Sequence, residues 1–161
     1  MKQAKIPILE TVKWICVILL VLFIVHQSAS GKESHTDFET MRAAVSEQFD
    51  MSNVLEADNQ MVKRLYGIDP GTFDGLVLYY PTTNMGAEEL LLVKLSDTEQ
   101  QESVREAIEN RLQTQKDSFE GYGIEQFDML EKSVIDVHGN YVLYVVSSNP
   151  AAVHQAFLDT L

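Results

Sequence analysis

Residues 134–146 read VIDVHGNYVLYVV, and this stretch decides the class of the fold. Two apolar runs rich in valine and tyrosine flank the pair Gly139-Asn140, which is among the strongest short signals of a tight β-hairpin. An aspartate interrupts one face of the first run, whereas the second run is apolar on both faces, as in a central strand. We therefore predict antiparallel strands at Val134–Val137 and Tyr141–Val146.

Two further strands are predicted upstream of the hairpin. Leu76–Tyr80 (LVLYY) is apolar on both faces, whereas Lys94 interrupts one face of Leu90–Leu95 (LLLVKL). The first and the last strands along the chain are therefore expected at the centre of the sheet. Numbered along the chain, the strands are predicted to lie in the order 2-1-4-3.

About five helices are predicted to pack against this mainly antiparallel, four-stranded sheet, which makes the domain α+β. Two of the helices follow apparent capping boxes, and another ends at a glycine suited to a left-handed cap. The predicted helices follow Thr36 with Glu39, span Asp58–Leu65 before Gly67, run from Ser96 with Glu99 to about Phe119, span Glu125–Lys132, and begin at Asn149-Pro150.

The N-terminal segment predicts export. Trp14–Val25 is an unbroken apolar run, and three lysines precede it. Counted from Ile6, the segment reaches the roughly 20 residues of a membrane span, so residues 1–26 are predicted to form one transmembrane helix. A cleaved signal peptide is the alternative, because its apolar core needs only about 7 to 15 residues. Residues 27–35 are then a linker, and residues 36–161 form the exported domain.

The lysines also set the predicted orientation. Positively charged flanks stay in the cytoplasm, so we expect a single-pass membrane protein with a cytoplasmic N-terminus and an extracytoplasmic C-terminal domain, or a secreted domain if the segment is cleaved. The membrane is thus the first expected partner. Cys16, the only cysteine, lies in the apolar run, so the domain has no disulfide and no thiol for catalysis or metal binding.

The exported part is strongly acidic. Residues 31–161 hold 23 acidic side chains against 9 basic ones. Such a charge repels nucleic acid, which we exclude as a partner, and it serves solubility or attracts cations and basic partners.

The long helix carries an anomaly. Arg111 and Gln115 fall on the apolar stripe that Ile108 and Leu112 define at 100° per residue. A buried guanidinium must be paired. The expected partners are carbonyls of the turn that follows, a nearby acid or an acidic ligand, so the pair is either structural or ligand-binding.

The stretch SFEGYGIEQF, residues 118–127, follows that helix and is interpreted as a joint between helices. Its two glycines permit unusual backbone conformations, and its tyrosine can cover the turn. The joint and the polar pair together form the candidate functional or structural cluster: Arg111, Gln115, Phe119, Gly121 and Tyr122.

No catalytic motif is found, and we expect no cofactor and no metal site. The four histidines are dispersed along the chain, and Glu88 and Glu89 point to opposite sides of a strand start, where both are expected to be solvated. The sheet suggests a binding role instead. If all helices lie on one face, a candidate partner surface is left bare; if the first two helices cover it, it is not. That surface would consist of Val77, Tyr79, Val142, Tyr144 and Val146.

Three segments resemble a family of uncharacterised extracytoplasmic domains of Gram-positive anaerobic bacteria: Ala57–Pro70, the stretch NRLQTQKDSFEGYGIEQF and Gly139–Ser147. The likeness covers about residues 40–160, and the five residues of the candidate cluster stand at the family's pattern positions. Many members are similar to lipoproteins or have one N-terminal anchor, and this chain has no lipidation cysteine. The resemblance implies a domain that accompanies membrane-bound O-acyltransferase systems and is accessory to the modification of surface polysaccharide.

Together these observations predict a membrane-tethered, non-catalytic binding or assembly module at the cell envelope. The alternatives are a small envelope hydrolase or transferase, with its site around Arg111, Gln115 and Tyr122, and a receptor for a sugar or another small ligand.

Overall fold

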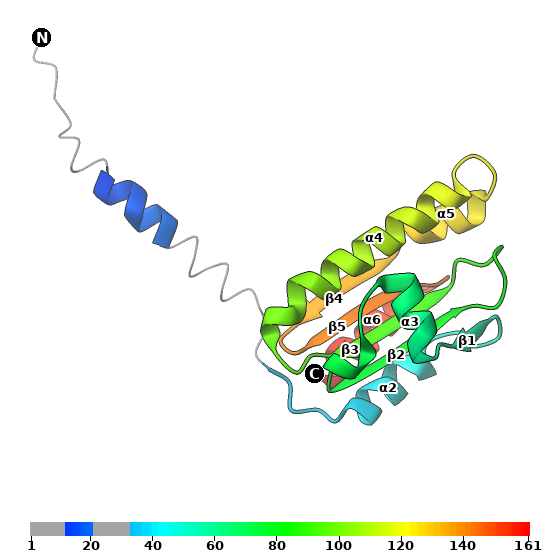
Figure 1. Ribbon diagram of the computed structural model, residues 1–161, viewed down its shortest axis with the longest axis horizontal. Helices are drawn as coiled ribbons and strands as arrows, with labels where there is room; N and C mark the ends of the chain where they lie inside the picture. Colours follow the sequence, from blue (N-terminus) through cyan, green and yellow to red (C-terminus); the bar gives the residue numbers. More distant parts are fainter. Residues whose placement is uncertain (1–11, 21–32) are drawn as a thin grey trace, which may run out of the picture. The chain divides into compact units, whose positions relative to one another are not determined.

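The computed structural model describes residues 12–20 and 33–161. The chain divides into two units, residues 1–31 and residues 32–161. In the first unit, residues 12–20 form a helix with exposed side chains. The second unit is the α+β domain that the rest of the fold concerns (Figure 1).

The prediction of a transmembrane helix is corrected by the structure. Of the residues that the structure describes, no helix is long and apolar enough to cross a membrane. Within the predicted segment the structure describes residues 12–20, which are helical. The remainder of the predicted segment, residues 1–11 and 21–26, lies outside the described residues.

The described sheet has five antiparallel strands instead of the predicted four. Their order across the sheet is β1-β2-β3-β5-β4, so the predicted order 2-1-4-3 is wrong. The strand at Glu89–Lys94, which was predicted to lie at an edge, is the central one. The strands are β1 (Val54–Glu56), β2 (Gly75–Pro81), β3 (Glu89–Lys94), β4 (Val134–His138) and β5 (Tyr141–Val146).

The burial of β3 explains its central position. Its residues Leu90, Leu91, Leu92 and Val93 are completely buried. Lys94 does not interrupt the strand, because it stands at the end, where its Nζ donates a hydrogen bond to a backbone carbonyl 2.9 Å away. The additional strand β1 pairs with the side of β2 that faces away from β3, so β2 is not an edge strand.

All five predicted helices of the domain are present. The helices are α2 (Phe38–Glu47), α3 (Asn59–Tyr66), α4 (Gln101–Phe119), α5 (Ile124–Glu131) and α6 (Pro150–Thr160), with short 3₁₀ turns η1 (Pro70–Thr72) and η2 (Thr98–Gln100).

The residues of the two predicted capping boxes are each displaced by one position. Asp37, not Thr36, caps α2, and its carboxylate accepts hydrogen bonds from two backbone N–H groups. Asp97 with Gln100, not Ser96 with Glu99, forms the capping box before α4. Aspartate is as good a cap as serine or threonine, so adjacent candidates cannot be separated by residue type. Gly67 ends α3 in the left-handed conformation, as predicted.

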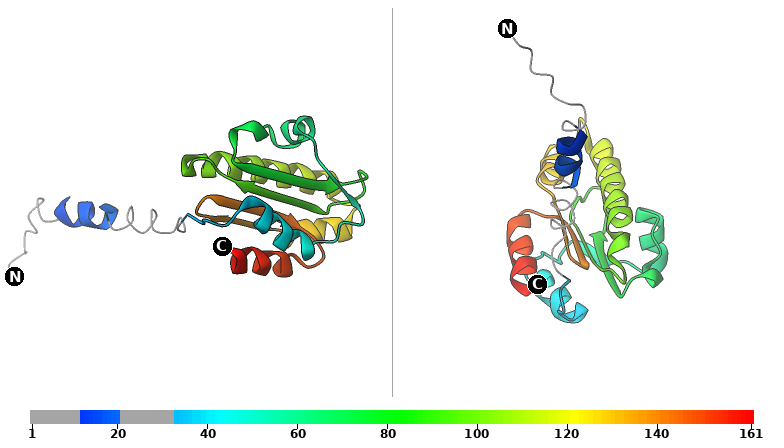
Figure 2. Two further views of the ribbon diagram at one scale, coloured as in Figure 1. Left: turned by 90° about the horizontal axis from the view of Figure 1, so that it is seen from below. Right: turned by 90° about the vertical axis from the view of Figure 1, so that its left-hand side faces the viewer.

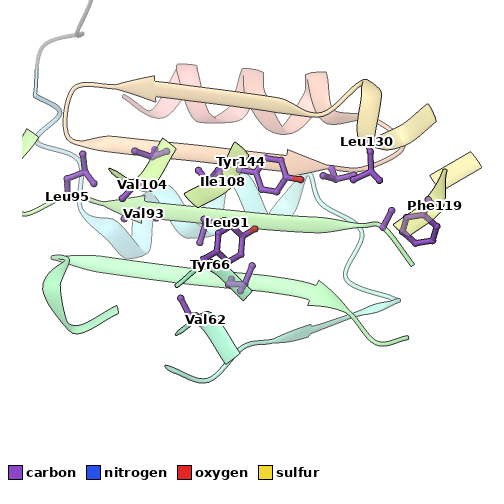
Figure 3. Packing of buried hydrophobic residues seen from close by; sticks show 14 residues of the cluster. Val62, Tyr66, Leu91, Val93, Leu95, Val104, Ile108, Phe119, Leu130 and Tyr144 are labelled. Atoms are coloured by element: carbon purple, nitrogen blue, oxygen red, sulfur yellow. The ribbon is translucent and has the colours of Figure 1, made fainter. Parts of the chain in front are cut away.

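The helices form two layers, one on each face of the sheet (Figure 2). Helices α2 and α6 cover one face and contribute Met41, Val45, Val153 and Phe157 to its core. Helices α3, α4 and α5 cover the other. There the core extends from Leu95 at one end to Phe119 at the other, as Figure 3 shows.

The residues that precede α2 are held against the domain. Ser34 is buried, and its Oγ donates a hydrogen bond to the carbonyl of Leu161 at 2.9 Å. Its backbone N–H donates to Oδ1 of Asn140, also at 2.9 Å. The end of the expected linker therefore packs on the hairpin turn and the C-terminal residue.

Candidate functional site

A buried carboxylate lies at the centre of the candidate site. Glu89, the first residue of β3, is completely buried on the face that α3, α4 and α5 cover. Arg111 of α4 binds it through two hydrogen bonds: Nε donates to Oε1 at 3.1 Å, and Nη2 donates to Oε2 at 2.7 Å. This two-point geometry is the strongest pairing available to a carboxylate.

Three further side chains complete the network around this carboxylate. Gln115, one turn beyond Arg111, donates from Nε2 to Oε2 of Glu89 at 3.1 Å. The hydroxyl of Tyr66, the last residue of α3, donates to Oε1 of Glu89. Tyr144 of β5 donates to Oε1 of Gln115 at 3.2 Å. The network thus joins two helices to the two central strands.

The environment raises the pKa values of three groups in the network, Tyr66, Tyr144 and Arg111. Burial raises the pKa of the Tyr66 phenol well above its usual value, and the Glu89 carboxylate adds to the increase. Burial and the same carboxylate raise the pKa of Tyr144. Burial by itself lowers the pKa of Arg111, but hydrogen bonding and attraction to Glu89 outweigh it, so this pKa is raised. Both phenols therefore stay neutral and Arg111 stays charged at neutral pH.

The sequence located two of the five residues of this network, Arg111 and Gln115. Arg111 and Gln115 face the core, as the helical stripe indicates, but the partner is Glu89, which was expected to be solvated. The alternation of β3 held the missing signal, because position 89 lies on the same face as Leu91 and Val93. An acid at that position must be buried with them.

Above the network lies an open cleft of about 470 Å³. Its walls come from α3, the loop between β2 and β3, and the end of α4. Arg111 and Gln115 line it from below, and Arg64 from one side. A neighbouring hollow of about 310 Å³ shares Arg64 and Arg111.

The joint at residues 118–127 connects α4 to α5, as the sequence predicts. Phe119 is buried, and Gly121 has a left-handed φ of 86°. Tyr122 is 63% exposed and lines the cleft. Of the five residues in the predicted cluster, the structure brings Arg111 and Gln115 together at Glu89, whereas the other three form the joint beside the cleft.

The predicted partner surface is not exposed. Its five side chains are buried, and they lie on opposite faces of the sheet: Val77 and Tyr79 under α2 and α6, the other three under α3, α4 and α5. Helices therefore cover both faces, but the first two, α2 and α3, lie on opposite faces and do not together form the expected cover.

A histidine–aspartate pair lies elsewhere in the described part of the chain. His154 of α6 contacts Asp136 of β4 with 2.6 Å between Nε2 and Oδ2, on the face of the sheet away from the cleft. Among residues 12–20 and 33–161, no group of three or more histidine, cysteine or acidic side chains could hold a metal ion.

Comparison with known proteins identifies the domain but not an activity. No curated protein and no solved structure matches this chain. One family model matches residues 47–147, described as a domain of unknown function, DUF4358. The match extends from the end of α2 to the residue after β5, and it includes Tyr66, Glu89, Arg111, Gln115 and Tyr144. Because it covers more than half of the sequence, the chain belongs to the DUF4358 family.

Proposed function

We propose that this domain is a non-catalytic binding module that acts outside the cytoplasm, at the cell envelope, and that its ligand or partner occupies the cleft above Arg111. One observation carries the proposal: Arg111 and Gln115 are fixed to the buried carboxylate of Glu89. They form a rigid floor for the cleft, which suits binding.

The lining of the cleft argues against the hydrolase or transferase alternative. Such an enzyme needs a nucleophile with a base beside it. The hydroxyl of Ser118, at the cleft wall, donates to the carbonyl of Thr114, a backbone group that cannot act as a base. Among the described residues that line the cleft, none is a histidine.

The location outside the cytoplasm is supported by the lysine-flanked apolar run at Trp14–Val25. The resemblance to extracytoplasmic domains supports the same location. It also favours a partner in an envelope O-acyltransferase system, for which this domain would be an accessory in polysaccharide modification.

Site-specific photo-crosslinking in living cells tests the binding function. A benzoylphenylalanine at Thr83, on the exposed loop that lines the cleft, is compared with one at Glu106, exposed on α4 outside the cleft. We expect irradiation to give a discrete adduct from position 83 and none from position 106. Equal adducts from both positions, or none from either, would contradict a role of the cleft in binding.

A further inference from the structure

The cleft differs in charge from the rest of the domain. Residues 31–161 hold 23 acidic side chains against 9 basic ones. The described residues that line the cleft nevertheless include Arg64 and Arg111 and no aspartate or glutamate. This reversal of charge favours an anionic ligand in the cleft, because the net charge of the rest of the domain is negative.

The buried ion pair also points its positive end toward the cleft. The Glu89 side chain is 0% exposed, whereas the Arg111 side chain is 15% exposed. Two guanidinium nitrogens of Arg111 bind Glu89. Its third nitrogen, Nη1, makes no hydrogen bond within the part of the chain that the structure describes. The guanidinium is thus a fixed donor, which binds a ligand oxygen without first losing side-chain freedom.

The remaining lining favours a ligand with hydroxyl groups and a flat face. The loop after β2 contributes the hydroxyls of Thr82 and Thr83 and the amide of Asn84, all on exposed residues. Tyr80 and Tyr122 contribute aromatic rings. Hydroxyl and amide groups match the hydroxyls of a sugar, and an aromatic ring packs on the apolar face of a pyranose.

We propose that the cleft binds a small anionic sugar, whose carboxylate or phosphate contacts Arg111 and Arg64 and whose ring lies against Tyr122. The proposal rests on the binding function argued above and names its ligand class. The volume of about 470 Å³ lies within the range of about 300 to 1,000 Å³ that is usual for small-molecule sites.

Titration of the purified protein, followed by ¹⁵N–¹H spectra, tests this ligand class. The probes are glucuronate, glucose 1-phosphate, glucose and inorganic phosphate. We expect one or both anionic sugars to shift the amides of residues 82–84 and 122, and added salt to weaken the binding. A response to glucuronate alone identifies the carboxylate as the recognised group, and a response to glucose 1-phosphate alone identifies the phosphate.

A matched pair of variants assigns the charge. Arg64 is exposed, so Arg64→Gln is not expected to disturb the fold. It should weaken binding about tenfold, as expected for one lost charge-assisted hydrogen bond. Arg105→Gln removes another exposed arginine, on α4, that does not line the cleft, and it should bind as the parent protein does.

Several outcomes would overturn the proposal. Glucose binding as tightly as the anionic sugars would remove the role of charge, and phosphate binding as tightly would remove the role of the sugar ring. Equal weakening by both variants, or no binding of either anionic sugar, would also reject it. A crosslinked adduct at position 83 together with failed titrations would reject only the ligand class and leave the binding function standing.

Discussion

A carboxylate without access to water, such as that of Glu89, is stable only if its charge is compensated. Taking one ion out of water costs several kcal/mol, which the two-point contact with Arg111 and two further donors must offset. Such a pair contributes little net stability over an apolar pair of similar volume. Replacing only one partner of the ion pair, however, leaves the other partner buried without a counter-charge. The network therefore locks α3 and α4 to the sheet in one arrangement.

Arg111→Met is expected to lower the free energy of unfolding by about 3 to 5 kcal/mol, because it leaves the buried Glu89 carboxyl group without its ionic partner. The double variant Glu89→Leu/Arg111→Met should recover most of this loss. Urea denaturation followed by circular dichroism measures both. Arg105→Met is the control, since its ion pair with Glu109 is exposed and should contribute less than about 1 kcal/mol.

An unchanged unfolding midpoint in Arg111→Met would show that the pair has no structural role. Additive losses in the double variant would show that Glu89 and Arg111 do not stabilise one another, since coupled residues give non-additive changes.

The raised pKa values of Tyr66 and Tyr144 predict a loss of stability in alkali. In the unfolded chain both phenols ionise near their usual pKa of 10.0, whereas in the folded protein they keep their protons to higher pH. Above that value the unfolded state binds fewer protons, so the free energy of unfolding falls as pH rises. Below it, these two groups should cause no pH dependence.

Urea midpoints measured from neutral pH to about pH 11 check this prediction. Tyr144→Phe removes one ionising phenol and should make the alkaline decline shallower. Tyr122→Phe, at an exposed tyrosine, is the matched control. A decline that is equally steep in Tyr144→Phe and in the parent protein would contradict the assignment.

At the scale of single residues, the sequence identified those residues that interrupt a regular apolar pattern. Arg111 and Gln115 were found because they interrupt a long apolar stripe, whose phase is well defined over several turns. Glu89 was missed because only two strand residues of the same face follow it. The pairing of an acid with an arginine 22 positions away depends on how α4 docks on the sheet, which local patterns do not encode.

At the scale of elements, the joint between α4 and α5 depends on two glycines for different reasons. Gly121 has a left-handed φ of 86°, and a Cβ there would meet no atom within 4 Å. Gly123 does not need a left-handed φ, but its Cβ would lie 2.5 Å from the ring of Phe119. Backbone strain governs the first position, and packing on the buried end of α4 governs the second.

Gly121→Ala should therefore cost about 1 to 2 kcal/mol through strain alone. Gly71→Ala is the matched control, since position 71 has no left-handed φ and a Cβ there makes only ordinary contacts. It should be neutral or slightly stabilising. Chemical denaturation of both variants makes the comparison, and an equal effect at the two positions would contradict the role of φ at Gly121.

The elements were predicted well in type and less well in arrangement. Helices with long stripes and the Gly139 hairpin follow from local residues. Strand β1 has only three residues and exposes Leu55, so it lacks the alternation that reveals longer strands. The predicted strand order was wrong because Lys94 gave β3 the appearance of an edge strand. Lys94 is the last residue of β3, and its long side chain extends to the carbonyl of Thr36, so it does not need an edge position.

At the scale of the whole molecule, helices cover both faces of the inner strands in the described domain, so the places left for a ligand are the edges of the sheet and the spaces between elements. The cleft above Arg111 is such a place. The two ends of the described domain lie together at a different place. There Thr36 donates a hydrogen bond from Oγ1 to the carbonyl of Thr160 at 2.7 Å. The cleft is lined by other residues, so contacts at this junction leave it unobstructed.

The proposed location outside the cytoplasm predicts that the surface of the domain can be labelled from outside the cell. The domain has no cysteine of its own, so the variant Cys16→Ala/Ser103→Cys carries a single thiol at an exposed position of α4. A membrane-impermeant maleimide should label the protein of intact cells and medium as completely as that of lysed cells, because no bilayer separates reagent from thiol. A cytoplasmic thiol protein is the control. Labelling of the domain only after lysis, in parallel with that control, would place it inside the cell and remove the basis for an envelope ligand.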